Sequence, residues 1–134
     1  MGVILKVQDL HLSFKGVKAL SGVAFSVAEG EFFAVIGPNG AGKTTLLNVL
    51  SGVYDPDRGE VVFLGQRLKG KSPQERARMG LGRTFQGLEI FRGMSVLENV
   101  KLGAELALPG YPMALPRAEK EWRLRVAQPL QYLQ

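Results

Sequence analysis

The sequence predicts an α/β fold in which a glycine-rich loop joins a buried strand to a helix. Residues 37–45 read Gly-Pro-Asn-Gly-Ala-Gly-Lys-Thr-Thr and fit the pattern G-x-x-x-x-G-K-S/T at every fixed position. The apolar run at 32–36 is typical of a buried strand, and residues 45–50 read as the opening of a helix. Alternating apolar residues between positions 3 and 28 predict an antiparallel β-layer. This order of elements predicts a site for the phosphates of a nucleoside triphosphate.

The β-layer consists of two predicted strands. The first covers residues 3–14, with a kink near residues 8–9 where a polar step interrupts the alternation. A turn at residues 15–16 leads into the second strand, and another turn at 28–30 closes it. We expect this β-layer to pack against the nucleotide-binding core.

Beyond the loop, local signals predict a helix, a strand and a second helix. The first helix ends at residues 51–52, because glycine is usual just past a helix C-terminus. A turn at 55–59 then precedes a strand at 60–65. Residues 72–75 (Ser-Pro-Gln-Glu) form a capping box with Pro at the first helical position, which predicts a short helix to about residue 80.

The last third of the chain is less regular. Residues 81–85 are compatible with a short strand. A second capping box at 95–98 (Ser-Val-Leu-Glu) predicts a helix through about residue 102. From 103 onward, prolines predict a loose connection and then a helix that Pro129 kinks or breaks.

Length and composition exclude several classes of function. The 134 residues leave room for one domain, and the absence of cysteine excludes disulfides and thiolate metal sites. His11 is the only histidine, and no apolar run approaches the roughly 20 residues that span a bilayer. The net charge of +5 is concentrated between residues 67 and 83. A nucleic-acid surface is one interpretation, but a solvated helix face beside a phosphate site is favoured, and no nucleic acid is expected as a partner.

The loop residues have predicted roles in binding a nucleotide. Its glycines let several N–H groups turn toward one anion, and the following helix presents unpaired N–H groups of its own. Lys43 is expected to reach the β- and γ-phosphates, Thr44 to ligate Mg²⁺, and Thr45 to serve the α-phosphate side. The alternative is a glycine-rich turn that binds nothing. The predicted cofactor-binding residues of the loop are Gly37, Pro38, Asn39, Gly40, Ala41, Gly42, Lys43, Thr44 and Thr45.

The amino-acid sequence of this loop resembles that of the corresponding loop in the ATP-binding subunits of ABC transporters. The resemblance extends to Phe14, which stands where that family places an aromatic residue that stacks on adenine. A core aromatic at a strand end is the alternative for Phe14. The resemblance implies an ABC ATPase-like P-loop NTPase fold with ATP and Mg²⁺ as ligands.

Gln86, in Arg-Thr-Phe-Gln, looks like the Q-loop glutamine of the same family. There it touches Mg²⁺ and water near the γ-phosphate and begins the segment that contacts the membrane permease. The resemblance therefore makes Lys43 and Gln86 the catalytic candidates and Thr44 and Gln86 the metal candidates. An ordinary polar loop residue is the alternative for Gln86.

Two further stretches resemble the subunits of branched-chain amino acid importers. These are residues 77–86 and the run Ile-Phe-Arg-Gly-Met-Ser-Val-Leu-Glu-Asn-Val at 90–100. We interpret residues 1–102 as the N-terminal part of an ABC ATP-binding domain. Residues 103–134 are interpreted as an incomplete part of its helical subdomain.

Several parts that the family needs for catalysis are not recognisable in the sequence. There is no Leu-Ser-Gly-Gly-Gln signature, no Walker B pair and no histidine after the phosphate loop. The chain therefore resembles the truncated N-terminal half of such an ATPase, and we expect weak ATP binding at best and negligible hydrolysis by this chain alone.

The resemblance also implies partners and a location. They are transmembrane permease subunits bound through the Q-loop region, a second ATP-binding subunit in the full-length form, and a cytoplasmic position, peripheral on the inner face of the membrane when assembled. Two alternatives stay open. One is a non-catalytic module that binds nucleotide or a permease, and the other is a different P-loop enzyme such as a small kinase.

Overall fold

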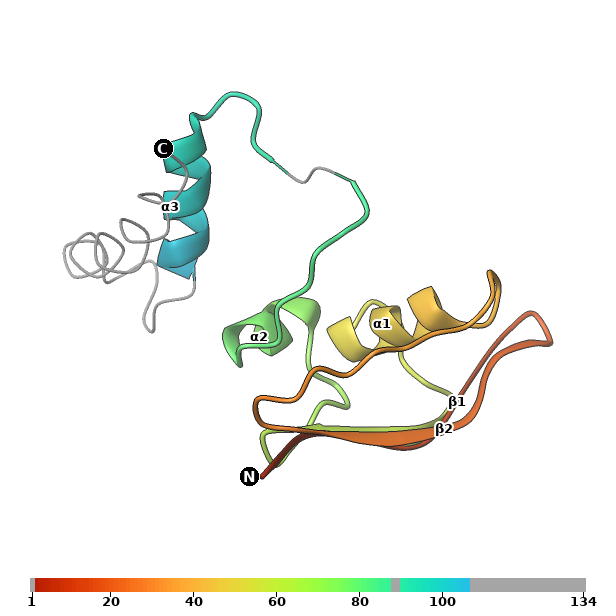
Figure 1. Ribbon diagram of the computed structural model, residues 1–134. Helices are drawn as coiled ribbons and strands as arrows, with labels where there is room; N and C mark the ends of the chain where they lie inside the picture. The colour runs from red at the N-terminus through yellow and green to blue at the C-terminus, as the bar shows by residue number, and fades with distance from the viewer. Residues whose placement is uncertain (1, 88–89, 107–134) are drawn as a thin grey trace. The chain divides into compact units, whose positions relative to one another are not determined.

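The computed structural model describes residues 2–87 and 90–106. The chain divides after Arg83 into two compact units. The loose connection predicted from residue 103 is wrong at its start, because residues 103–106 are helical. The rest of that connection and the predicted broken helix lie outside the described residues, from position 107 onward. The elements follow one another (Figure 1) as β1 (Val3–Phe14), β2 (Val17–Ala28), α1 (Lys43–Ser51), β3 (Arg58–Phe63), β4 (Gln66–Arg67), α2 (Pro73–Arg78) and α3 (Val96–Leu106).

The strands of the first unit form one antiparallel sheet in the order β2-β1-β3-β4, which confirms the predicted β-layer. β1 pairs with β2 up to the hairpin end, where Phe14 lies opposite Val17. On its other side β1 pairs with β3 only as far as His11, which lies opposite Arg58. Because β3 begins at Arg58, the last residues of β1 extend beyond β3.

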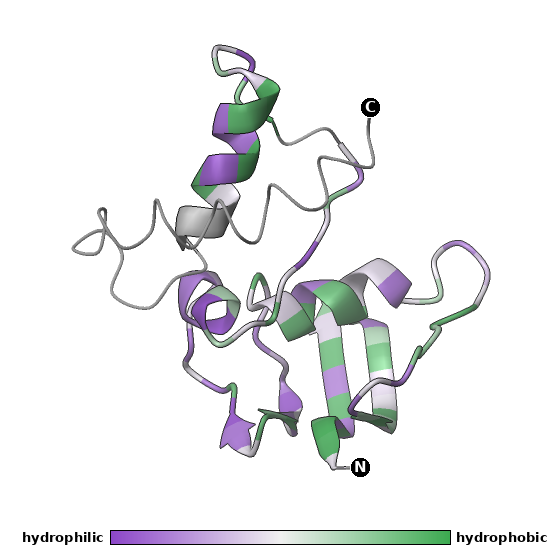
Figure 2. Ribbon diagram, turned by 60° about the vertical axis from the view of Figure 1, so that its left-hand side comes forward, coloured by the Kyte–Doolittle hydropathy of each residue, from purple (hydrophilic) through white to green (hydrophobic). Residues whose placement is uncertain are grey.

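Helices α1 and α2 cover one face of this sheet (Figures 1 and 2). Figure 2 shows polar and apolar bands alternating along the strands, as expected when one face is covered and the other meets water. The buried apolar side chains of the first unit form one core cluster. Burying one large apolar side chain stabilises a fold by about 1.5–3 kcal/mol, so this core cluster is the main source of stability in the first unit. The buried core consists of Val7, Leu10, Leu12, Leu20, Leu46, Val49, Val61 and Leu68.

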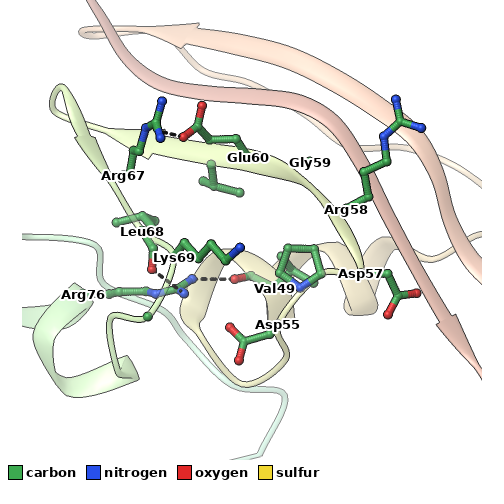
Figure 3. A pocket seen from close by; sticks show the side chains of 13 residues that line it. Val49, Asp55, Asp57, Arg58, Gly59, Glu60, Arg67, Leu68, Lys69 and Arg76 are labelled. Atoms are coloured by element: carbon green, nitrogen blue, oxygen red, sulfur yellow. Dashed lines mark hydrogen bonds and ion pairs between the residues drawn. The ribbon is translucent and has the colours of Figure 1, made fainter.

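Arg76 of α2 is buried and holds the C-terminal end of α1. Its side chain is only 3% exposed, and its guanidinium donates to the carbonyl oxygens of Val49 (2.6 Å) and Leu50 (3.0 Å). It also donates to the carbonyls of Leu68 (2.9 Å) and Lys71 (3.0 Å). Figure 3 shows this side chain reaching toward Val49 and Leu68. Burial lowers the pKa of Arg76, but four accepting carbonyls replace the water that the charge has lost.

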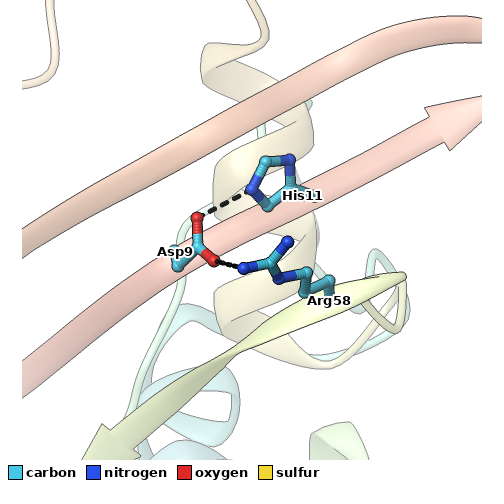
Figure 4. Close-up of polar contacts among 3 residues, drawn as sticks. All are labelled: Asp9, His11 and Arg58. Carbon is cyan, nitrogen blue, oxygen red and sulfur yellow. Dashed lines mark hydrogen bonds and ion pairs between the residues drawn. The ribbon is translucent and has the colours of Figure 1, made fainter.

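β1 is irregular at the predicted kink. Asp9 has a positive φ of 46°, and the register with β3 shifts between Gln8 and His11. A Cβ on Gly59 would lie 2.3 Å from the Asp9 carbonyl oxygen, so glycine is required there. The Asp9 carboxylate lies between His11 Nε2 (2.8 Å) and Arg58 Nη2 (2.6 Å), as Figure 4 shows. The hydrogen bond with His11 is the main cause that lowers the pKa of Asp9.

Both predicted capping boxes are present. The Glu75 carboxylate accepts from the backbone N–H of Ser72 at 2.7 Å, and Ser72 Oγ accepts from the N–H of Glu75 at 3.3 Å. Ser95 and Glu98 repeat this pattern with the same two distances. Hydrogen bonds from the serine backbone lower the pKa of both glutamates. The helix after the second box extends to Leu106, beyond the predicted end near residue 102.

Two of the predicted strands are wrong. Residues 32–36 form no strand, and Ile36 is 90% exposed. Residues 81–85 form none either. A strand needs a hydrogen-bonded neighbour, and in the described ranges the sheet pairs only β1 to β4 with one another. An apolar run alone does not supply that neighbour.

Candidate nucleotide site

The glycine-rich loop is pressed against β2 at its last glycine. Gly42 has a φ of 93° and stands at the N-cap position of α1. A Cβ at this position would lie 2.4 Å from the carbonyl oxygen of Ala19 and 3.2 Å from Leu20. Since side chains avoid both that φ and that contact, only glycine fits at position 42. The helix then begins with the N–H of Leu46 donating to the Gly42 carbonyl at 2.8 Å.

The N-terminus of α1 is left open by its own sequence. In the described part of the chain, no side chain caps it, and its first turn carries no acidic residue. Helix N–H groups at such an end are unpaired within the helix and face outward with a partial positive charge. An end of this kind can bind a phosphate, and the nine-residue α1 begins at Lys43.

The ammonium of Lys43 lies against its own loop. Lys43 Nζ donates to the carbonyl oxygens of Gly37 (2.5 Å) and Pro38 (2.7 Å). These two bonds fold the Lys43 side chain back onto the start of the loop. Thr44 and Thr45 follow in the first turn of α1 and thus stand at its N-terminal end.

Phe14 lies on the hairpin that touches the loop. It ends β1 opposite Val17, and the contact of Gly42 with Ala19 lies only two residues further along β2. The hairpin thus brings Phe14 and the loop to the same part of the first unit. The ring is 41% exposed, unlike the buried residues of the core, and its centroid lies 5.1 Å from that of Tyr54.

Gln86 lies in the second unit, at an exposed bend. Its predicted contact with Mg²⁺ and with the γ-phosphate region stays a prediction. The segment that leads to it is fixed in the first unit by Arg83, whose Nη1 donates to Asn48 Oδ1 (2.6 Å) and Ser51 Oγ (2.8 Å) of α1.

A hollow of about 490 Å³ lies elsewhere in the first unit. Figure 3 shows it between the C-terminal half of α1, the turn before β3, and Arg76. No residue of the phosphate loop lines it, and the Glu60 and Arg67 side chains in its wall form an ion pair at 2.6 Å. This hollow is therefore separate from the predicted nucleotide site.

Sequence reasoning missed two residues beside Phe14. The ring of Tyr54 packs edge-on against the Phe14 ring at an angle of 68°. The Asp57 carboxylate accepts from the backbone N–H of Ser13 at 2.8 Å. Asp57 lies in a stretch of Asp, Pro and Gly that is typical of a turn, and this turn explains its residue type. The sequence therefore gave no sign that Asp57 would contact Ser13 or that Tyr54 would contact Phe14.

Two features are absent from the residues that the structure describes, 2–87 and 90–106. Neither range contains a cluster of three or more histidine and carboxylate side chains able to hold a metal ion. None of the helices described there has the length and apolar character that crossing a membrane requires.

The open helix end, the forced glycine and the lysine folded over the loop define the class of P-loop nucleotide-binding proteins. Within that class, the family model described as "ABC transporter" matches residues 20–133, so the chain belongs to the ABC transporter family.

Two similar proteins are both transport ATP-binding proteins, but their names give different solutes. The chain is 45% identical over 102 residues to a probable branched-chain amino acid transport ATP-binding protein, LivG, of Archaeoglobus fulgidus, covering 76% of this chain and 40% of LivG. It is 38% identical over 106 residues to the xylose/arabinose import ATP-binding protein XylG of Sulfolobus acidocaldarius, covering 79% of this chain and 42% of XylG.

A solved structure shares the fold. It is the ADP conformation of MJ1267, an ATP-binding cassette of an ABC transporter, with a TM-score of 0.71 and 40% identity, covering 77% of this chain and 41% of that one. The fold of this chain is therefore α/β, of the ABC ATPase type. The chain spans about two fifths of the length of these proteins.

Proposed function

We propose that the chain is the nucleotide-binding part of an ABC transporter ATP-binding subunit and binds ATP together with Mg²⁺. The observation that carries the proposal is the open N-terminus of α1, which the Gly42–Ala19 contact holds in place and beside which Lys43 lies. Helix N–H groups and an ammonium at one place suit the oxygens of a polyphosphate.

Each residue of the site has a distinct task in this proposal. Lys43 exchanges the carbonyls of Gly37 and Pro38 for the β- and γ-phosphate oxygens. The hydroxyl of Thr44 is the donor for Mg²⁺, which when bound neutralises phosphate charge, and Thr45 serves the α-phosphate side. Phe14 offers its exposed ring to the adenine.

The role of Gln86 is proposed from the family alone. A side-chain amide near Mg²⁺ and the attacking water can register a γ-phosphate without titrating. The same segment is proposed to contact permease subunits. A second ATP-binding subunit, and a place on the cytoplasmic face of the membrane when assembled, complete the proposal for the longer protein.

The division into an ATP-binding part at 1–102 and a partial helical subdomain at 103–134 belongs to the same proposal. The solute that we propose is a branched-chain amino acid. The sequence of residues 77–86 and 90–100 supports this choice, as does the similarity to LivG. The similarity to XylG favours a sugar importer as the second candidate.

We propose further that this chain alone does not hydrolyse ATP at a significant rate. Its 134 residues contain no signature motif and no Walker B pair, so nothing in them is recognisable as the group that orients the attacking water. Phosphate release that disappears in Lys43→Ala would contradict this part of the proposal.

Binding of Mg-ATP to the 134-residue chain, measured by calorimetry and thermal shift, tests the proposal. At a concentration near 100 times the dissociation constant, ATP should stabilise the chain by about 2.7 kcal/mol. Lys43→Ala should abolish this gain because it removes the cation of the site. Lys69→Ala, which changes an exposed lysine outside the loop, is the control and should leave the gain intact. A gain that survives in Lys43→Ala would contradict the proposed site.

A further inference from the structure

We propose that Tyr54 and Asp57 are positioning residues that hold Phe14 ready for the base of the nucleotide. The inference rests on the proposed function and extends it to the loop after α1. Its starting point is the end of β1, where three contacts from residues 54–57 converge on residues 11–14.

The first step is that the end of β1 lacks a neighbouring strand on one side. β3 reaches only as far as the pair of His11 and Arg58, whereas β1 continues to Phe14. The carboxylate of Asp57 takes the place of that strand by accepting from the Ser13 N–H at 2.8 Å. The N–H of Asp57 in turn donates to the His11 carbonyl at 2.9 Å. The backbone that carries Phe14 is thereby fixed from both sides.

The second step concerns the ring itself. The Tyr54 ring meets the Phe14 ring edge-on, with centroids 5.1 Å apart and an angle of 68° between the planes. Aromatic pairs favour this arrangement because the positive edge of one ring meets the negative face of the other. Since Phe14 is still 41% exposed, the contact restrains the ring without covering it.

The third step links this loop to the phosphate site. The N–H of Tyr54 donates to the Asn48 carbonyl at 3.3 Å, and the N–H of Val53 donates to the same oxygen at 2.8 Å. Asn48 belongs to α1, which begins at Lys43. One helix thus starts at the phosphate loop and ends by fixing the residue that packs on Phe14.

A ring that is already held loses less freedom when a base stacks on it. Immobilising such a side chain on binding costs affinity, so removing the restraint should weaken ATP binding by roughly 3–10-fold. A purely structural role at the hairpin end would instead affect every ligand of the loop. Tripolyphosphate distinguishes the two roles because it carries the phosphates of ATP but no base.

The test compares the affinities of the 134-residue chain for Mg-ATP and Mg-tripolyphosphate. Tyr54→Ala and Asp57→Ala should each weaken ATP binding 3–10-fold and leave tripolyphosphate binding unchanged. Tyr54→Phe keeps the ring edge and Asp57→Asn keeps an acceptor for Ser13, so both should restore most of the affinity. Val53→Ala, a change beside Tyr54 at an exposed position, is the neutral control.

A double-mutant cycle sharpens the test. In a Phe14→Ala background, Tyr54→Ala should have no further effect on ATP binding, because no ring is left to position. An additive loss in that background would overturn the inference, as would an equal loss for both ligands or unchanged ATP binding in the single variants.

Failure of the inference is distinguishable from failure of the proposed function. If the unmodified chain binds ATP and tripolyphosphate equally well, and Lys43→Ala weakens both, the phosphate site stands and the positioning role is contradicted. If it binds neither ligand, the proposed function is contradicted and the positioning role falls with it.

Discussion

The two ends of α1 are built in opposite ways. Among the described residues, the N-terminal end has no side-chain cap and no acid in its first turn. The C-terminal end is closed by Gly52 in the left-handed conformation and by the buried Arg76, which donates to the last carbonyls of the helix. Arg83 adds two bonds to side chains of the same half of α1.

This contrast separates the residues that we propose to bind phosphate from residues that stabilise the fold. α2 shows that the chain can cap a helix N-terminus with its own side chains, since Ser72 and Glu75 form a complete capping box there. The open start of α1 therefore reflects its sequence of glycines and a lysine, which leaves N–H groups for an anion. The closed end is fixed to α2 through the hydrogen bonds of Arg76.

The largest effect is expected at the closed end. Arg76→Met should lower the free energy of unfolding by about 3–4 kcal/mol, because several buried carbonyls lose their donor at once. Urea unfolding followed by circular dichroism would measure it. Arg78→Met, at an exposed position of the same helix, should change stability by less than about 0.5 kcal/mol. Equal effects in the two variants would show that Arg76 does not secure α1.

A smaller loss of stability, joined to a loss of function, is expected at the open end. Gly42→Ala should cost about 2–3 kcal/mol and abolish the ATP-dependent thermal shift, since a Cβ would meet the Ala19 carbonyl at 2.4 Å. Gly70→Ala is the matched control because Gly70 also has a positive φ, 77°, but has nothing within 4 Å of a Cβ. It should cost only about 1 kcal/mol and leave ATP binding intact. If both variants bind ATP alike, the loop does not depend on its contact with β2.

The smallest effect concerns the capped start of α2 and depends on pH. The Ser72 backbone hydrogen bond lowers the pKa of Glu75 below its ordinary value of 4.5. Because the folded-state pKa is depressed, the stabilisation is complete above that value and disappears as the pH falls through the folded-state pKa. In Glu75→Gln, unfolding free energies measured between about pH 6 and pH 2.5 should therefore fall less steeply than in the unmodified chain. Parallel curves for the two proteins would contradict this assignment.

The features that the sequence predicted correctly are those set by neighbouring residues. Both capping boxes, the end of α1 at Gly52 and the kink near Asp9 depend on contacts across a few positions. The helix that follows the glycine-rich loop belongs to the same group, whereas phosphate binding by residues 37–45 stays a prediction.

The features that sequence reasoning missed depend on distant partners. The apolar run at 32–36 has strand character but finds no neighbour among the described strands. The contact of Gly42 with Ala19, and that of Tyr54 with Phe14, join segments that approach one another only after the sheet has formed. The residue types alone could not show that Tyr54, from the loop after α1, would pack against the ring of Phe14.

The bonds of Lys43 to its own loop bear on how often the site can be used. The ammonium donates to the carbonyls of Gly37 and Pro38 in this structure, and in the proposed function it donates to phosphate oxygens instead. When such a nucleotide departs, the carbonyls of Gly37 and Pro38 would again be available to the cation as acceptors. The empty loop would then need no counter-ion for Lys43 before the next nucleotide arrives. Such reversibility would suit the nucleotide-binding role that we propose for this chain.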